Sequence, residues 1–193
     1  DAIFAINYAL AERTSAWCDF FVEAIGEYVL NTWEPHGYVT DEQADWLIAR
    51  IAADGKLDST VELELLLRVL ERASNVPDKL KTFVLREIER AVLTGSGPTR
   101  DGGQLAGAGV TEAECRVLRR AIFAVGGDRP AAVSKLEAEA LFRIKDATVG
   151  AANCPEWKTL FVQGVAIFLM AFVSPDAQIS RDRAAELDKF MAD

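Results

Sequence analysis

The chain has 193 residues, of which 50% are hydrophobic and 26% are charged, and its net charge is −9. This composition allows one folded domain or two small ones and excludes disorder over most of the length. A strongly acidic surface repels phosphate groups, which argues against nucleic acid and anionic membranes as partners. We therefore expect a soluble, cytoplasmic protein.

The cysteines and the single histidine exclude several kinds of site. Cys18, Cys115 and Cys154 are odd in number and lack the C-x-x-C spacing, so neither a disulfide framework nor a thiolate zinc site is expected, and a reducing compartment is favoured. His36 is the one imidazole, and it lies in the turn-forming segment Glu34–Gly37. Nucleophilic catalysis of the Ser-His or Cys-His kind is therefore not expected.

Hydrophobic periodicity predicts an all-α chain. Apolar side chains recur at helical spacing, as in Leu63, Leu66 and Leu70, and no segment shows sustained strand-like alternation. The longest apolar run, Gly164–Val173, is shorter than the ~20 residues of a membrane-spanning helix, so no transmembrane segment is expected and the run predicts a buried core helix. In chain order, we predict nine helices at residues 2–11, 15–32, 41–53, 60–74, 77–93, 111–125, 134–149, 155–172 and 180–192.

Capping signals mark where several of these helices begin. A hydroxyl residue followed three positions later by Glu or Gln can form a capping box, in which the two side chains satisfy free N–H groups of the first turn. Pro77 and Pro155 suit the first helical position, where the missing N–H has no cost. The predicted boxes are Thr40 with Gln43, Ser59 with Glu62, Thr111 with Glu114, and Ser134 with Glu137.

The sequence also resembles itself. A shift of 140 positions places Trp17 on Trp157, and a shift of 71 positions places Thr40 on Thr111. These registers predict an internal repeat of roughly 70 residues and about three helices, packed as a helical bundle or a short array.

One connecting segment differs from the others in composition. Residues 95–109 contain six glycines and few large side chains, which predicts a linker or loop between helical regions 1–94 and 110–193. The two regions can also form a single domain. The glycines do not follow the spacing of a phosphate-binding loop.

Acidic and basic residues alternate along two predicted helices. Glu64, Arg68 and Glu71 share one helical stripe, where they can form ion pairs. We interpret the stripe as a solvated, salt-bridged face; the alternative is that it faces a neighbouring helix and fixes how the units pack. The pattern recurs in Glu139, Arg143 and Asp146.

An acidic loop is the best candidate for a metal site. Residues 53–58 read ADGKLD, similar to the middle of an EF-hand loop, but with Gly55 at the sixth position the first position is Arg50 and the twelfth is Val61. An EF-hand site is therefore not expected, and a helix-capping turn also explains the loop.

The same loop carries a resemblance to a known family. The segment Ala53–Ser59 running into the acidic, leucine-rich helix of Glu62 resembles the TerB-like, tellurite-resistance-type helical domains over about residues 40–93, with a degenerate echo at 111–170. The resemblance implies an all-helical fold, a part in metal-stress responses and membrane-proximal complexes, and acidic residues that hold a divalent cation. The positions it points to are Asp54, Asp58 and Glu62.

Three functions follow from these observations. The repeat and the lack of a catalytic motif favour a non-enzymatic protein-interaction or scaffold module without a cofactor, which binds a protein segment in an exposed apolar or aromatic groove. The first alternative is a divalent-metal-responsive stress protein of the TerB-like type, and the second is a carboxylate-based hydrolase. The candidate groove residues are Trp17, Trp33, Trp46 and Trp157, of which Trp17 and Trp157 recur in register and are expected in the core.

Overall fold

The computed structural model describes residues 2–52, 57, 59–100, 109–124 and 132–172. This part of the chain forms eight helices and no strand, which confirms the all-α prediction. The ninth predicted helix, at 180–192, lies outside the described residues. The helices are α1 (Ala2–Ala9), α2 (Ser15–Asn31), α3 (Asp41–Ile51), α4 (Thr60–Arg72), α5 (Asp78–Thr94), α6 (Glu112–Ile122), α7 (Lys135–Ala147) and α8 (Pro155–Phe172).

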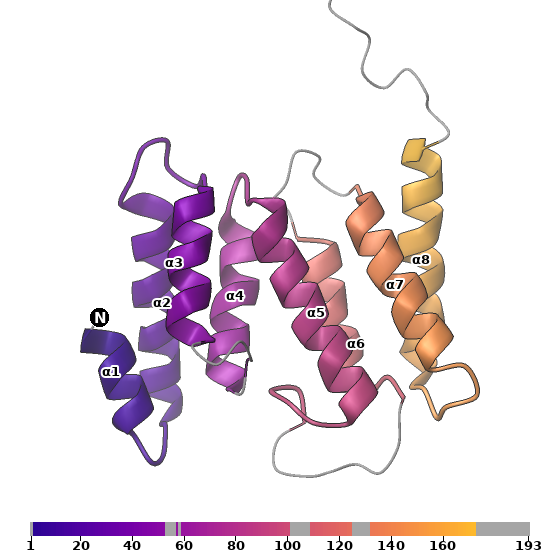
Figure 1. Cartoon of the computed structure of the whole chain (residues 1–193), viewed down its shortest axis with the longest axis horizontal. Coiled ribbons are helices and arrows are strands. Elements are labelled where there is room, and N and C mark those ends of the chain that lie inside the picture. The colour runs from indigo at the N-terminus through magenta and orange to yellow at the C-terminus, as the bar shows by residue number, and fades with distance from the viewer. Residues whose placement is uncertain (1, 53–56, 58, 101–108, 125–131, 173–193) are drawn as a thin grey trace, which may run out of the picture.

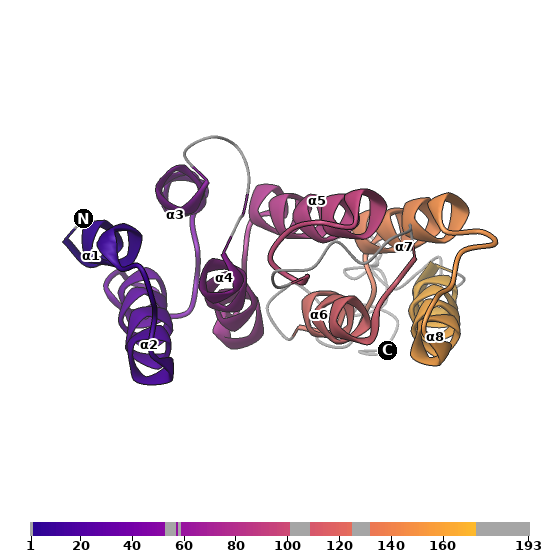
Figure 2. The ribbon, with the colours of Figure 1, turned by 90° about the horizontal axis from the view of Figure 1, so that it is seen from below.

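The helices form an elongated slab of two layers, and α1 closes one end (Figures 1 and 2). In Figure 2, α3, α5 and α7 form one layer, and α2, α4, α6 and α8 form the other. Neighbours within each layer are in contact, and α5 also contacts α4 and α6 across the layers. The three-helix repeat itself stays a prediction.

The core lies between the two layers. Leu47 of α3, Leu66 of α4, Ile88 of α5, Leu118 of α6 and Leu141 of α7 are all buried members of one hydrophobic cluster. The cluster draws side chains from both helical regions predicted on either side of residues 95–109. Burial of such side chains is the main stabilising contribution to a helical fold of this kind.

Ion pairs cross from helix to helix along the slab. The guanidinium of Arg120, on α6, bonds both oxygens of Glu71 (Nε–Oε1 2.6 Å) and both oxygens of Glu64 (Nη1–Oε2 2.6 Å), which lie on α4. Arg68 lies 3.8 Å from Glu64 within α4. The first stripe is therefore salt-bridged and partly exposed, as interpreted, but its ion pairs also reach a neighbouring helix, as the alternative predicted.

The second stripe and two further helices are linked in the same way. Arg143 of α7 donates to Glu89 of α5 at 3.0 Å rather than pairing along its own helix. Arg72 of α4 forms ion pairs with Glu23 and Glu27 of α2. Partly exposed pairs contribute little individually, but their geometry specifies which helices pack side by side.

Three of the four predicted capping boxes are confirmed. Thr40, Thr111 and Ser134 each accept the N–H of the residue three positions on, whose side chain bonds back. The fourth prediction was wrong, because the Ser59 side chain makes no capping hydrogen bond. The backbone of Ser59, at φ −115° and ψ 132°, is rotated away from the φ near −80° and ψ near 165° of the other caps. Pro77 is the N-cap of α5 rather than its first helical residue.

Helix α8 is less buried than the sequence predicted. It packs one side against α6 and α7 at the end of the slab, with Trp157, Leu160 and Gly164 turned inward. Leu169 and Met170, in the middle of the apolar run, are exposed. Among the described residues, no helix is both long and apolar enough to cross a membrane.

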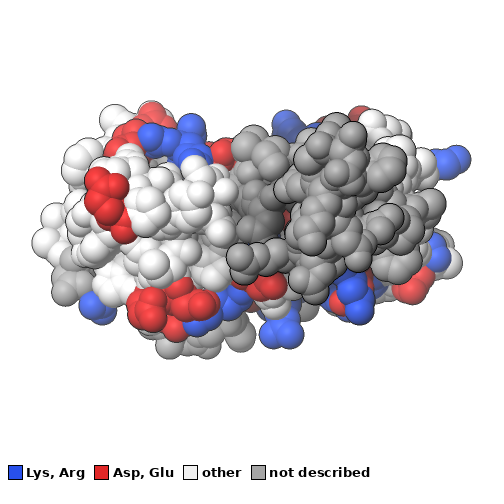
Figure 3. Space-filling model, turned by 90° about the horizontal axis from the view of Figure 1, so that it is seen from above, with Lys and Arg blue, Asp and Glu red and all other residues white. Residues whose placement is uncertain are grey.

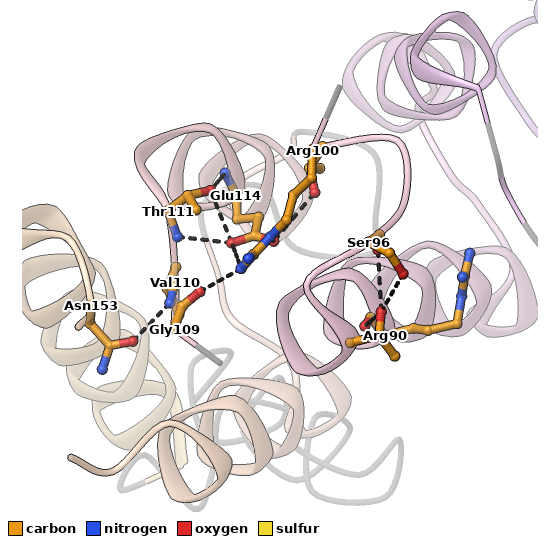
Figure 4. Close-up of polar contacts among 10 residues, drawn as sticks. Arg90, Ser96, Arg100, Gly109, Val110, Thr111, Glu114 and Asn153 are labelled. Atoms are coloured by element: carbon orange, nitrogen blue, oxygen red, sulfur yellow. Dashed lines mark hydrogen bonds and ion pairs between the residues drawn. The ribbon is translucent and has the colours of Figure 1, made fainter. Parts of the chain in front are cut away.

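The described ends of segment 95–109 are fixed to α6 by a buried ion pair (Figure 4). The guanidinium of Arg100 bonds both carboxylate oxygens of Glu114, with Nε–Oε1 at 2.8 Å, and also donates to the carbonyl of Gly109 at 2.6 Å. Glu114 is also the partner of Thr111 in its capping box. The Arg100 guanidinium therefore joins the two described ends of the segment, and the Glu114 carboxylate joins Arg100 to the start of α6.

Candidate functional site

The connection between α2 and α3 is anchored on both sides by backbone hydrogen bonds. The N–H of Gly37 donates to the carbonyl of Leu30 at 2.7 Å, and the Gly37 carbonyl accepts the N–H of Ser74 at 2.7 Å. Gly37 has φ 81°, and a Cβ there would lie 2.9 Å from the Ser74 Oγ, so a side chain is disfavoured on both counts. The segment that carries Trp33 is thereby held in place.

Gln43 joins the start of α3 to the end of α2. Its Oε1 accepts the N–H of Thr40 at 2.7 Å, and its Nε2 donates to the carbonyl of Val29 at 3.3 Å. The capping residue of one helix therefore also satisfies a carbonyl near the end of the other. This arrangement fixes the distance between the two helix ends that border the candidate site.

Three aromatic rings line a cavity at this junction. The Tyr28 ring centroid lies 4.9 Å from that of Trp33 in an edge-to-face contact and 5.3 Å from that of Trp46. Tyr28 is 41% exposed and Trp33 is 44% exposed, although large aromatic side chains are usually covered. The cavity measures about 430 Å³ and is lined by Tyr28, Val29, Trp33, Glu34, Thr40, Glu42, Gln43 and Trp46.

A second cavity, without a charged lining residue, adjoins the first. It measures about 450 Å³, and it shares Tyr28 and Trp46 with the aromatic cavity. Phe4 of α1 lies on its other side, 5.8 Å from Trp46 between ring centroids. The remaining lining residues are Ala2, Ile3, Ala24 and Ile25. The two cavities lie on either side of shared wall residues, Tyr28 and Trp46, and we refer to them together as the aromatic groove.

The aromatic groove carries negative charge at one end. Hydrogen bonds from the Glu42 backbone N–H and then from the Thr40 hydroxyl hold the pKa of the Glu42 carboxyl below its usual range. Glu34 lies 2.6 Å from the exposed His36 ring. Seen from above in Figure 3, the left half of the molecule presents a largely uncharged surface, with acidic and basic side chains gathered toward its edges.

The structure places the four tryptophans differently. Trp33 and Trp46 line the aromatic groove. Trp157 is 5% exposed, as expected for the core. Trp17 is half-buried and donates its indole N–H to Asn7 at 3.2 Å. Sequence reasoning missed Tyr28, although its position on the last turn of a predicted helix, five residues before Trp33, was a usable signal.

Of the predicted metal ligands, only Glu62 is described. It lies in the first turn of α4 and is 3% exposed, while Asp54 and Asp58 lie outside the described residues, so their grouping stays a prediction. Among described residues, no group of three or more His, Cys, Asp or Glu side chains is arranged to hold a metal.

Leu57, the described residue of the acidic loop, is anchored to α5. Leu57 is fully buried, and its N–H donates to Glu87 at 2.9 Å. Its carbonyl accepts a bond from Arg90 at 3.0 Å, and Arg90 also pairs with Glu87. Glu87 lies among the buried, mostly apolar residues of α5, and this contact explains its position there.

No protein-family model, curated protein or solved structure matches this chain. Function is therefore inferred from the chemistry of its own residues.

Proposed function

We propose that this chain is a non-enzymatic helical-repeat protein that acts as a protein-interaction or scaffold module, and that a segment of a partner protein binds in the aromatic groove. The observation that carries the proposal is the exposure of Tyr28 and Trp33 beside Trp46 in one cavity. Tyrosine and tryptophan are enriched among the residues that dominate binding energies at protein interfaces.

The groove has the dimensions and rigidity that such binding requires. Its two cavities, about 430 and 450 Å³, each lie within the range of ligand-binding clefts. The connection that bears Trp33 is fixed by its bonds to Leu30 and Ser74. A preformed site loses less conformational freedom on binding, so more of the contact energy appears as affinity.

A comparison of the first turns of α3 and α6 supports a binding role for Trp46. The capping boxes at Thr40 and Thr111 have nearly identical backbone angles, and the predicted repeat places them in register. In that register, Trp46 corresponds to Val117, so the later unit folds without a tryptophan at this position. The residue that corresponds to Gln43 in this register is Glu114. Its carboxylate bonds the buried Arg100, whereas Gln43 lines an open cavity. A tryptophan at this position is therefore not needed to form a helix start of this kind.

A peptide-display selection tests this function. A random library of twelve-residue peptides is selected on the wild-type chain, and the enriched peptides are then measured on Trp33→Ala and Tyr38→Ala. Tyr38 is the matched control, because it is an exposed aromatic residue of the same connection that does not line the groove. We expect peptides that lose at least about tenfold in affinity with Trp33→Ala and less than about twofold with Tyr38→Ala. Equal binding to both variants would refute the assignment of the groove.

A further inference from the structure

The walls of the groove differ in a way that selects the chemistry of its occupant. The cavity between Tyr28, Trp33 and Trp46 combines aromatic rings with carboxylates, and no Lys or Arg is among its described lining residues. The adjoining cavity is formed by apolar side chains such as Phe4 and Ile25. A ligand that fills both cavities must therefore suit aromatic rings and carboxylates in one cavity and apolar side chains in the other.

Aromatic rings attract cations through the negative electrostatic potential of their faces, and tryptophan does so most strongly. Three such rings in one cavity provide this potential from more than one direction, and the Tyr28 ring touches both indoles. A purely apolar ligand would gain contact area there, but it would gain no electrostatic attraction from the adjacent carboxylates.

The carboxylates add a direct charge. Glu42 lines the cavity from the first turn of α3, and Glu34 lines it from the α2–α3 connection. The nearby basic residue Lys79 is engaged by Asp45 at 2.8 Å and Asp41 at 3.3 Å. Because Glu34 lies against His36, we place the incoming cation beside Glu42, which is exposed and lines the same cavity.

We infer that the partner segment is basic, and that it places the cationic side chain of a lysine, an arginine or a methylated lysine against Tyr28, Trp33 and Trp46, beside Glu42. This inference rests on the proposed function, because it names the chemical class of the segment that the groove binds. An apolar residue that neighbours the cation fills the cavity beside Phe4. The net charge of −9 favours the approach of a basic segment over longer distances.

Three short peptides test the charge of the occupant. They share the sequence acetyl-Gly-Leu-Xaa-Ser-Gly-amide, in which Xaa is lysine, trimethyllysine or the neutral norleucine. Binding is followed by intrinsic tryptophan fluorescence at low ionic strength. We expect the trimethyllysine peptide to bind about three- to thirtyfold more tightly than the norleucine peptide, the range that cation–π attraction supplies. We expect Trp33→Leu, which keeps apolar bulk but removes the ring, to abolish this preference.

Two matched variants, each of which neutralises one glutamate, test the contribution of the carboxylate. Glu42→Gln is expected to reduce the preference for the cationic peptides several-fold, whereas Glu112→Gln, at an exposed acid in the first turn of α6, leaves it unchanged. If norleucine binds as tightly as the cationic residues, the inference is overturned while the groove remains a peptide site. If none of the peptides alters the fluorescence at about 10 mM, a concentration chosen for weak ligands, both the inference and the proposed function are overturned.

Discussion

Arg100 and Glu114 form a two-point ion pair in which both side chains are almost fully buried, with Nε–Oε1 at 2.8 Å and Nη2–Oε2 at 3.0 Å. The pair connects the segment after α5 to the first turn of α6. A buried charge is shielded from water, so its ion-pair partner must compensate for the lost hydration. If that partner is removed, the remaining charge is unpaired and the free energy of unfolding falls.

The first prediction concerns this pair. Glu114→Gln removes the negative charge but preserves the capping box, because Gln43 fills the corresponding position at α3. We expect the free energy of unfolding to fall by about 3 kcal/mol, as for other buried pairs that lose one partner. Urea denaturation measures the change, and exposed Glu112→Gln is the control. A loss equal to that of the control would show that the buried pair does not stabilise the fold.

The capping boxes give a second prediction, with an internal control. Ser134→Ala removes a hydroxyl that accepts the N–H of Glu137, whereas Ser59→Ala removes one that makes no capping bond. We expect a loss of about 1 kcal/mol for the former and less than about 0.5 kcal/mol for the latter. Thermal denaturation of the two variants distinguishes them, and equal losses would contradict the observed difference between the caps.

Arg120 supports a third prediction. Hydrogen bonds to Glu71 and then Glu64 raise the pKa of its guanidinium, so the group is charged at all accessible pH values. The side chains are about one third exposed, so solvent screens the pairs and their contribution is modest. A double-mutant cycle of Arg120→Met and Glu64→Gln should give a coupling free energy of about 1 kcal/mol at low salt.

High salt tests the electrostatic origin of that coupling. At about 1 M NaCl the Debye length is near 3 Å, so the coupling should fall by at least half. Arg119→Met, at an exposed arginine of the same helix that bonds Gln163 of α8, should show no coupling to Glu64→Gln. A coupling insensitive to salt would mean that packing rather than charge connects α4 and α6.

Cys115 gives a pH-dependent prediction. Burial, and next the neighbouring Cys154, raise the pKa of the Cys115 thiol from 9.0 to about 11. The folded state therefore holds the proton to a higher pH than the unfolded state does. The protonated Cys115 thiol therefore contributes to the free energy of unfolding in full below pH 9, and this contribution is lost as the pH rises toward 11.

Replacement of the thiol isolates this effect. In Cys115→Val the valine cannot titrate, so the free energy of unfolding should fall less between pH 9 and 11 than in the wild type. Urea denaturation across that pH range measures the difference. Parallel pH profiles for the two proteins would contradict the raised pKa.

The sequence predicted the local features of the fold because those features depend on nearby residues. The Thr111 box needs only Glu114, three positions away, and both helical periodicity and capping are visible over such distances. Contacts between distant residues were not predictable in this way. Arg120 meets Glu64 across 56 positions, and no local pattern distinguishes it from other arginines on the same helix.

The aromatic groove was predictable in part. Trp33 and Trp46 were candidates because tryptophan is costly to expose without a role, but their proximity depends on the turn that Gly37 makes possible. Exposure of α8 was missed, since an apolar run in sequence does not reveal whether a helix lies inside a slab or at its end.

The most direct test of the central claim uses the indole N–H resonances of the four tryptophans. A selected peptide is added to the ¹⁵N-labelled protein, and the resonances are assigned by single Trp→Phe replacements. We predict that the signals of Trp33 and Trp46 shift in a saturable manner, while those of Trp17 and Trp157, which lie outside the groove, stay in place. Saturable binding that leaves Trp33 and Trp46 unshifted would contradict the account.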